Sequence, residues 1–131
     1  MIKPVINFDG YRISNIELKT YESEEQFESL RERDKEISLE VRLFEEKDEA
    51  ILKMESIIFD ERNNRSLQIS ILGFFTVYDK ENASEYLRVN GSAILFPYLR
   101  MIMSIVSSLD NENAIVLPAI NTNSFTEDKQ M

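Results

Sequence analysis

The chain has 131 residues, with 24 acidic and 15 basic side chains, and its formal net charge at pH 7 is −9. This length predicts a single domain over residues 1–131. Cysteine and histidine are both absent, which excludes disulfides, thiol nucleophiles, zinc sites built from Cys and His, and His-based triads. The negative charge disfavours nucleic-acid partners, because phosphate backbones attract basic surfaces.

The start of the chain lacks a basic region followed by the long apolar run of a targeting signal, so we expect a cytoplasmic protein. The most apolar stretch, 93–109, is interrupted by Pro97 and Arg100 and is shorter than the roughly 20 residues of a membrane helix. We therefore expect no membrane insertion. Residues 22–49 hold twelve acids and five bases. They form either a solvated loop with the wet face of a strand or an acidic rim beside an apolar binding surface.

The first predicted strand covers residues 11–21. Its apolar positions change phase at 14–15, which predicts a β-bulge there. The next segment, Ser-Glu-Glu-Gln at 23–26, fits a capping box and predicts a short helical turn that carries Phe27 and Leu30.

Two further strands are predicted from alternation of apolar and polar side chains. The pattern is clearest over 37–43, and it resumes over 50–59 after a polar turn at 45–49. Residues 60–65 include two adjacent asparagines and predict a hairpin connection, because asparagine tolerates positive φ.

A fourth strand is predicted over 67–78. One face is apolar along its length and is interrupted by Gly73; it consists of Leu67, Ile69, Ile71, Phe75 and Val77. The other face becomes apolar towards the end of the strand, at Leu72, Phe74 and Tyr78. A strand that is apolar on both faces must be covered on both sides. In a chain this small, that predicts a second subunit or a bound ligand.

The remaining element is a helix. Residues 79–88 are expected to form a polar connection and 90–92 to break the chain, with Ser92 as helix cap and Pro97 in the first turn. One apolar stripe recurs at helical spacing, at Leu95, Leu99, Ile102, Val106 and Leu109. Additional apolar side chains lie off this stripe and predict burial on more than one side; these are Met101, Met103 and Ile105.

Residues 110–113 are expected to end the helix, and a short extended piece follows over 115–117, before Pro118. The tail from 121 to 131 is expected to be frayed. Strands followed by a helix predict an α+β fold, with a four-stranded antiparallel sheet and one long helix.

Catalytic chemistry is not expected. The chain has only three glycines and no phosphate-binding loop. Glu55 is the best candidate for a carboxylate with a raised pKa, but its place in a strand is more typical of a solvent-facing side chain. The acidic turn at 45–49 lacks the spacing and glycine of a calcium loop. We therefore predict no enzyme activity, no metal and no cofactor.

Aromatic residues and methionines cluster along the fourth strand and the helix, at Phe74, Phe75, Tyr78, Phe96, Tyr98, Met101 and Met103. This pattern is typical of an ordinary core. It is also typical of an adaptable surface for non-native apolar segments, because flexible methionines and flat rings suit promiscuous binding.

Residues 90–100, with the sequence Asn-Gly-Ser-Ala-Ile-Leu-Phe-Pro-Tyr-Leu-Arg, resemble the start of the main helix of the SecB family of export chaperones. The segment Val-Leu-Pro-Ala-Ile-Asn at 116–121 resembles the one that follows that helix in the family, and Gly-Phe-Phe at 73–75 resembles the end of the fourth strand. The resemblance extends from residue 11 to about 121.

This resemblance implies an ATP-independent holdase of the cytoplasm that assembles as a dimer or a dimer of dimers, keeps unfolded preproteins from aggregating, and serves protein export. It places the client groove at Phe27, Leu30, Phe74, Phe75, Phe96 and Tyr98. It also places an oligomer interface at Leu67, Ile69, Ile71, Leu99, Ile102 and Val106.

The chain differs from the family in two respects. The second helix is shortened or absent, and the family acids that face the translocation motor SecA correspond to Asn15, Lys19 and Gln68 here. Binding of SecA is therefore open. A dedicated SecB-like chaperone for a single partner such as an antitoxin, and a non-chaperone module for an apolar ligand or a scaffold, remain alternatives.

Overall fold

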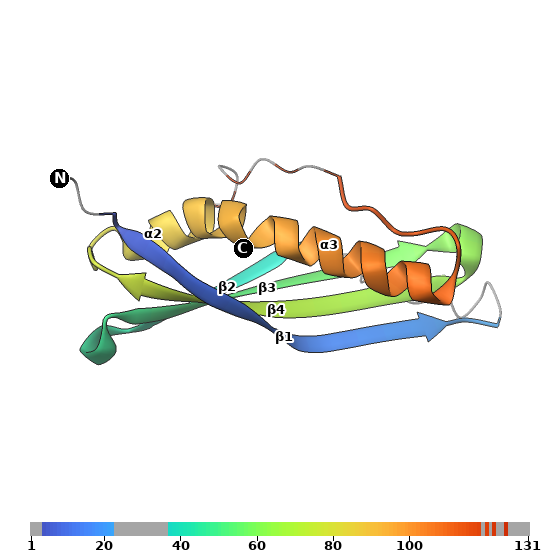
Figure 1. Cartoon of the computed structure of the whole chain (residues 1–131), viewed down its shortest axis with the longest axis horizontal. Helices are drawn as coiled ribbons and strands as arrows, with labels where there is room; N and C mark the ends of the chain where they lie inside the picture. The colour runs from blue at the N-terminus through green and yellow to red at the C-terminus, as the bar shows by residue number, and fades with distance from the viewer. Residues whose placement is uncertain (1–3, 23–36, 119, 121, 123–124, 126–131) are drawn as a thin grey trace.

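Four antiparallel strands form one sheet in the order β1-β4-β3-β2, and one long helix lies along a single face of it (Figure 1). The structure is a computed structural model that describes residues 4–22, 37–118, 120, 122 and 125. The strands are β1 (Ile6–Thr20), β2 (Ser38–Phe44), β3 (Glu49–Asp60) and β4 (Arg65–Val77). The predicted α+β class is confirmed, although β1 begins at Ile6, ahead of the predicted start at residue 11.

Two bulges keep the apolar side chains of β1 on the helix side of the sheet. The pairing with β4 shifts between Phe8 and Gly10, and again between Ile13 and Asn15. Each shift adds one residue to β1. Because side chains alternate along a strand, the extra residue returns the following apolar side chains to the helix side. The second bulge confirms the one predicted at 14–15. The first contains Gly10, whose φ of 145° is accessible to glycine at little cost.

Short connections set the register of the two hairpins. A 3₁₀ turn, η1 (Glu45–Lys47), joins β2 to β3 and ends at Asp48 with φ 52°. A second turn, η2 (Glu61–Asn63), joins β3 to β4 and ends at Asn64 with φ 48°. The prediction that an asparagine supplies the positive φ of the second hairpin is confirmed.

The helix is longer than the sequence indicates. It starts with α2 (Ala83–Tyr86), passes through the π-helical turn η3 (Leu87–Gly91) and continues as α3 (Ser92–Asp110). The predicted break at 90–92 is therefore wrong, and the polar connection predicted over 79–88 ends at residue 82. Gly91 serves packing instead, because a β-carbon there would lie 3.3 Å from Cδ2 of Leu52. Ser92 is buried within the helix rather than capping it, and Pro97 lies in the helix interior.

The core lies between the helix and the sheet. Its fully buried side chains include Leu52, Met54, Leu67, Ile69, Ile71, Leu87, Leu95, Leu99 and Met103. Leu109 was predicted to join the buried stripe, but it is 82% exposed, because it lies about 40° around the helix from the exposed Ile105 and away from the sheet. By length and composition, the continuous helix Ala83–Asp110 would suffice to cross a membrane. Core helices share that property, and this helix packs along the sheet.

A buried arginine connects the β3–β4 hairpin to the end of α3. Arg65 at the start of β4 is completely buried. Its Nε donates to Asp60 Oδ2 at 2.9 Å, and its Nη1 donates to the carbonyl oxygen of Ser107 at 2.8 Å and to Asp110 Oδ2 at 3.2 Å. Its Nη2 donates to the carbonyl oxygen of Asn113. We call this set of contacts the Arg65 clasp.

Candidate binding surface

The helix carries two apolar stripes, and the sheet covers only one of them. At about 100° per residue, Leu95, Leu99 and Ile102 point in one direction, and all three are buried. A second stripe lies roughly 100° away around the helix axis and faces β1; it consists of Ile94, Tyr98, Met101 and Ile105. Three of these four side chains are exposed and Tyr98 is half-buried. The burial predicted for Met101 and Ile105 is therefore not provided by the described part of the chain.

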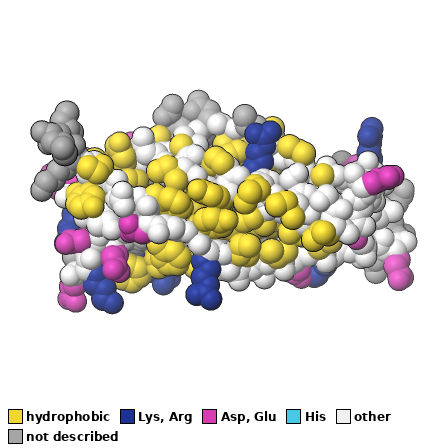
Figure 2. Space-filling model, in the orientation of Figure 1, with side chains coloured by type: hydrophobic (Ala, Val, Ile, Leu, Met, Phe, Trp, Pro, Cys, Tyr) yellow, Lys and Arg dark blue, Asp and Glu magenta, His cyan; other side chains and the backbone are white. Residues whose placement is uncertain are grey.

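Strand β1 extends this stripe into a wider surface. Its side chains on the helix side include Tyr11, Ile13 and Ile16, which pair with Gly73, Ile71 and Ile69 of β4 and are all exposed. Figure 2 shows hydrophobic side chains gathered in a continuous band along the middle of this face. We call the second helix stripe together with these three β1 residues the apolar face. Contiguous exposed apolar surface of this kind marks interaction sites.

A series of aromatic contacts leads from one end of the apolar face towards the core. The rings of Tyr11 and Tyr98 are stacked with centroids 4.4 Å apart, and the Tyr98 ring lies 5.8 Å from that of Phe8. The Phe8 ring in turn lies 5.4 Å from that of Phe75, which is buried. We call these four residues the aromatic ladder. It places flat apolar rings at the junction of β1, β4 and the helix.

A cavity of about 360 Å³ lies at the same end of the sheet as the ladder but on the face opposite the helix, because Phe74 and Ile51 alternate with the helix-side residues Phe75 and Ala50. Its lining combines aromatic and aliphatic side chains with a few charges at the rim: Asp9, Phe44, Lys47, Glu49, Ala50, Ile51, Phe74 and Phe75. Phe44 is exposed and Phe74 is half-buried. A cavity of this size and character can accept a large apolar side chain.

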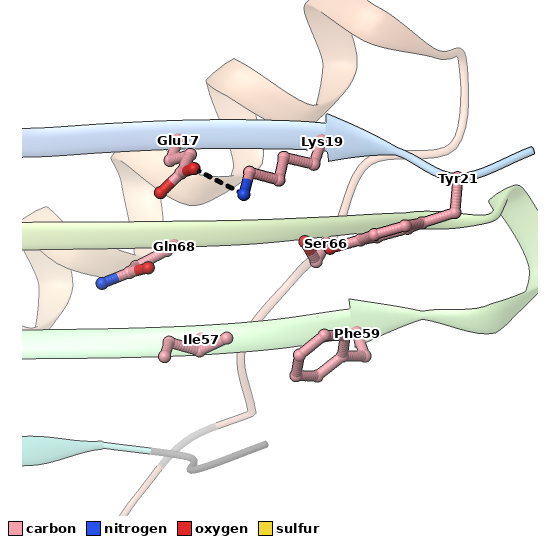
Figure 3. A pocket seen from close by; sticks show the side chains of 7 residues that line it. All are labelled: Glu17, Lys19, Tyr21, Ile57, Phe59, Ser66 and Gln68. Carbon is pink, nitrogen blue, oxygen red and sulfur yellow. Dashed lines mark hydrogen bonds and ion pairs between the residues drawn. The ribbon is translucent and has the colours of Figure 1, made fainter. Parts of the chain in front are cut away.

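Towards the β3–β4 hairpin, the face of the sheet opposite the helix is more polar. Figure 3 shows a smaller cavity there, of about 110 Å³, lined by Glu17, Lys19, Tyr21, Ile57, Phe59, Ser66 and Gln68. Lys19 Nζ lies 3.0 Å from Glu17 Oε1. Glu55 accepts hydrogen bonds from Gln68 Nε2 at 3.2 Å and Ser70 Oγ at 2.6 Å, so its carboxylate is engaged within the sheet. This surface has mixed charge rather than an excess of acid.

The structure brings two of the six predicted groove residues, Phe75 and Tyr98, together on the helix side of the sheet. Phe75 and Tyr98 are joined through Phe8 on the helix side, whereas Phe74 points to the opposite face of the sheet and lines the cavity there. Phe96 is buried on another side of the helix. Phe27 and Leu30 lie outside the described residues. Client binding by this set stays a prediction.

The predicted interface residues lie mainly inside the chain's own core. Leu67, Ile69 and Ile71 are completely enclosed between sheet and helix, as is Leu99, while Ile102 is nearly so and Val106 is half-buried. A second chain could not contact the enclosed side chains without moving the helix. Any role of theirs in assembly is therefore indirect, and a charge at Ile69 would disrupt folding of the subunit itself.

Sequence reasoning missed Phe8, Tyr11, Ile13, Ile16 and Phe44 as surface residues. The alternation in β1 was visible, and it implied that one face of the strand is covered. One signal could have shown that these side chains are exposed. The helix and β1 together carry more apolar side chains than one helix packed on one sheet can bury.

No cluster of three or more Asp, Glu, His or Cys side chains that could hold a metal ion occurs in the described part of the chain. The apolar face offers contact with apolar groups, and the lining of the 360 Å³ cavity includes the charged residues Asp9, Lys47 and Glu49.

Comparisons with known proteins support the fold. No protein-family model matches the chain. It is 26% identical over 126 residues to an uncharacterized protein of Methanocaldococcus jannaschii, MJ0357, covering 91% of this chain and 81% of that protein. The structure is similar to the Mycobacterium tuberculosis SecB-like chaperone Rv1957, solved in complex with a ChAD peptide from the Rv1956 HigA1 antitoxin, with a TM-score of 0.70 at 9% identity over 88% of each chain.

A protein of unknown function from Streptococcus agalactiae has a TM-score of 0.59 at 10% identity, covering 88% of this chain and 97% of that one. At these identities the likeness shows the fold alone. The four-stranded antiparallel sheet and single long helix of this chain form a SecB-like fold.

Proposed function

We propose that this protein is an ATP-independent chaperone that holds extended apolar segments of non-native polypeptides. The observation that carries the proposal is the apolar face, which adjoins the aromatic ladder. The subunit has a buried core of its own and still exposes this continuous hydrophobic surface. A holdase needs such a surface and no catalytic machinery.

The expected affinity follows from burial. One large apolar side chain contributes about 1.5–3 kcal/mol when it leaves water. A client that inserts three side chains gains about 5–9 kcal/mol before the cost of ordering it, which corresponds to micromolar or weaker binding of one segment. Several segments of one unfolded chain raise the total affinity through effective concentration.

The two ends of the surface suit different partners. The aliphatic end suits a second copy of the chain, because it includes the edge strand β1. It consists of Ile13 and Ile16 of β1 with Met101 and Ile105 of the helix. The aromatic end, with Tyr11 and Tyr98, suits client side chains because flat rings adapt to varied partners. We propose a dimer or a dimer of dimers on this basis.

The proposal has two versions, which differ in the client that the chaperone binds. General export of preproteins is one version, but the polar face at Lys19 and Gln68 lacks the acidic character that would support SecA. A chaperone dedicated to one partner is the second candidate. It is favoured by the SecB-like chaperone of the same fold that was solved with an antitoxin peptide.

An aggregation assay tests the proposal. The purified protein, without ATP, should suppress light scattering of a reduced, unfolding model protein. Tyr11→Ser in the aromatic ladder should weaken suppression. Tyr86→Ser is the matched control, because Tyr86 is 39% exposed against 36% for Tyr11 and lies outside the apolar face. Absence of suppression at molar excess would reject a general holdase, and specific binding of one partner protein would then support the dedicated version.

A further inference from the structure

The cavity of about 360 Å³ lies on the face of the sheet opposite the helix, and the proposed chaperone activity does not use it. We call it the outer cavity. Phe74 of β4 and Ile51 of β3 pair across the strands at its floor, and both side chains are half-buried. Phe44 of β2 also lines it and is 36% exposed. Apolar side chains are therefore partly open to solvent on a face that the helix does not cover.

The bulge in β1 keeps the outer cavity open. The residue of β1 that pairs with Phe74 is Gly10. In an antiparallel pair, the side chain of the opposite residue lies about 4.5–5.5 Å away and covers its neighbour. Gly10 has no side chain, and a β-carbon built there would meet no heavy atom within 4 Å beyond its chain neighbours. The β1 side of the Phe74 ring is therefore left accessible to a ligand.

Charged side chains also line the outer cavity, and among them the acids outnumber the bases. Asp9 and Glu49 lie on either side of Thr76, because Thr76 of β4 pairs with β1 on one side and with Glu49 of β3 on the other. The Asp9 carboxylate accepts hydrogen bonds from Thr76 Oγ1 at 2.7 Å and from Asn7 Nδ2 at 2.9 Å. These bonds fix its direction and leave its charge in place. The lining includes one basic residue, Lys47.

This combination suits a ligand with an apolar body and a positive charge. The volume is at the lower end of the range for ligand pockets, about 300–1,000 Å³, so it suits one large side chain. A flat ring gains most there, because aromatic rings attract one another beyond the area that they bury and both Phe44 and Phe74 are available. A cation beside that ring would lie next to the carboxylates of Asp9 and Glu49. The net charge of −9 adds to the attraction for basic segments.

We propose that the outer cavity binds a partner protein through an aromatic side chain that is next to a lysine or arginine. This site goes beyond the proposed chaperone function and does not depend on it. The outer cavity and the apolar face lie on opposite sides of the sheet, so a client and this partner can bind one subunit at the same time. The site is also separate from the polar cavity at Lys19 and Gln68, because Phe74 follows Gln68 by six residues, about 20 Å along a strand.

Two blocked dipeptides, N-acetyl-Phe-Arg-amide and N-acetyl-Phe-Glu-amide, probe the site by NMR. Labelled isoleucine methyl groups report on the two faces separately, because Ile51 lines the outer cavity and Ile105 lies on the apolar face. The Phe-Arg dipeptide should shift the Ile51 signal with a Kd of about 1–10 mM, and the Phe-Glu dipeptide should bind several-fold more weakly. The Ile105 signal should not distinguish the two. Equal Kd values from the Ile51 signal, or no shift of it, would overturn the proposal.

Substitutions at exposed positions test the two halves of the ligand. Phe44→Ser should weaken binding of the Phe-Arg dipeptide by about 2–10-fold. Tyr86→Ser is its matched control, because Tyr86 is 39% exposed and lies on α2, outside the lining. Asp9→Asn should reduce the preference for Phe-Arg over Phe-Glu by about 1.5–5-fold, and Glu85→Gln, also exposed, should leave it unchanged.

The remaining isoleucine signals show whether each variant is folded. If folded Phe44→Ser binds the Phe-Arg dipeptide as tightly as Tyr86→Ser does, the aromatic part of the proposal is wrong. If Asp9→Asn keeps the full preference for Phe-Arg, the positive charge of the partner is not read at this cavity. Either result overturns the proposal and leaves the chaperone function of the apolar face untouched.

Discussion

Replacing Arg65 with methionine should remove the strongest polar link between the hairpin and the helix end. The side chain is completely buried, and its guanidinium serves two carboxylates and two backbone carbonyl oxygens. Methionine fills a similar volume but leaves Asp60 and Asp110 without their counter-charge. Losing the guanidinium costs about 3–5 kcal/mol, because the carbonyl oxygens of Ser107 and Asn113 and the two partly exposed carboxylates all lose their donor.

This free energy translates into a measurable change of melting temperature. At about 2.1 cal/mol/K per residue, a chain of 131 residues has an unfolding entropy of about 0.28 kcal/mol/K. Arg65→Met should therefore lower Tm by about 10–18 °C, measured by calorimetry at about pH 7 and one fixed protein concentration. Arg62→Met on the same hairpin is the control, since Arg62 is exposed and should change stability by less than about 0.5 kcal/mol.

The origin of the loss can be tested separately. If stranded carboxylates cause it, adding Asp60→Asn and Asp110→Asn to Arg65→Met should recover part of the stability. A loss below about 1 kcal/mol for Arg65→Met would refute the reasoning, since the clasp would then contribute little.

Three other substitutions test separate parts of the molecule. Burial raises the pKa of the Asp60 carboxyl, but hydrogen bonds from Asn63 and Arg65 and the charge of Arg65 outweigh it and hold the pKa below its ordinary value of 3.8. The stability from Asp60 is therefore present above about pH 4 and lost as the pH falls through the lowered pKa, so Asp60→Asn should flatten acid denaturation in that range. Gly73→Ala should lower the free energy of unfolding by about 1–3 kcal/mol in denaturant titrations, because its β-carbon would lie 2.9 Å from a ring carbon of Phe75; unchanged stability would show that the ring moves freely. Ile105→Glu should shift the particle mass by light scattering towards the monomer, while the free energy of unfolding of the dilute subunit stays within about 0.5 kcal/mol; an unchanged mass would remove the apolar face as the assembly surface.

The strands and their faces could be read from the order of residues because each depends on local periodicity. The alternation over 37–43 and 50–59 predicted β2 and β3, and the phase change at 14–15 predicted a bulge that the pairing of β1 with β4 confirms. The positive φ of Asn64 was likewise a local property. These features need no knowledge of distant residues.

The start of the helix could not be read in this way. Gly91 in an Asn-Gly-Ser sequence is typical of a break, yet the chain uses it to bring the helix close to Leu52. Ala83 and Leu87 are buried against the sheet, so packing extends the helix across a polar stretch. Local preference was overridden by a contact between segments that are far apart in the chain.

The composition and periodicity of the chain determined that it would form a β-sheet with an apolar helix and would carry more hydrophobic side chains than one such layer can cover. Which of them stay exposed was decided only by the tertiary structure. Ile69 and Ile105 are the same residue type, each in an apolar pattern, but the helix lies over Ile69 and leaves Ile105 exposed to solvent. Exposure depends on where the second layer lies, and that is a property of the packed molecule rather than of any segment.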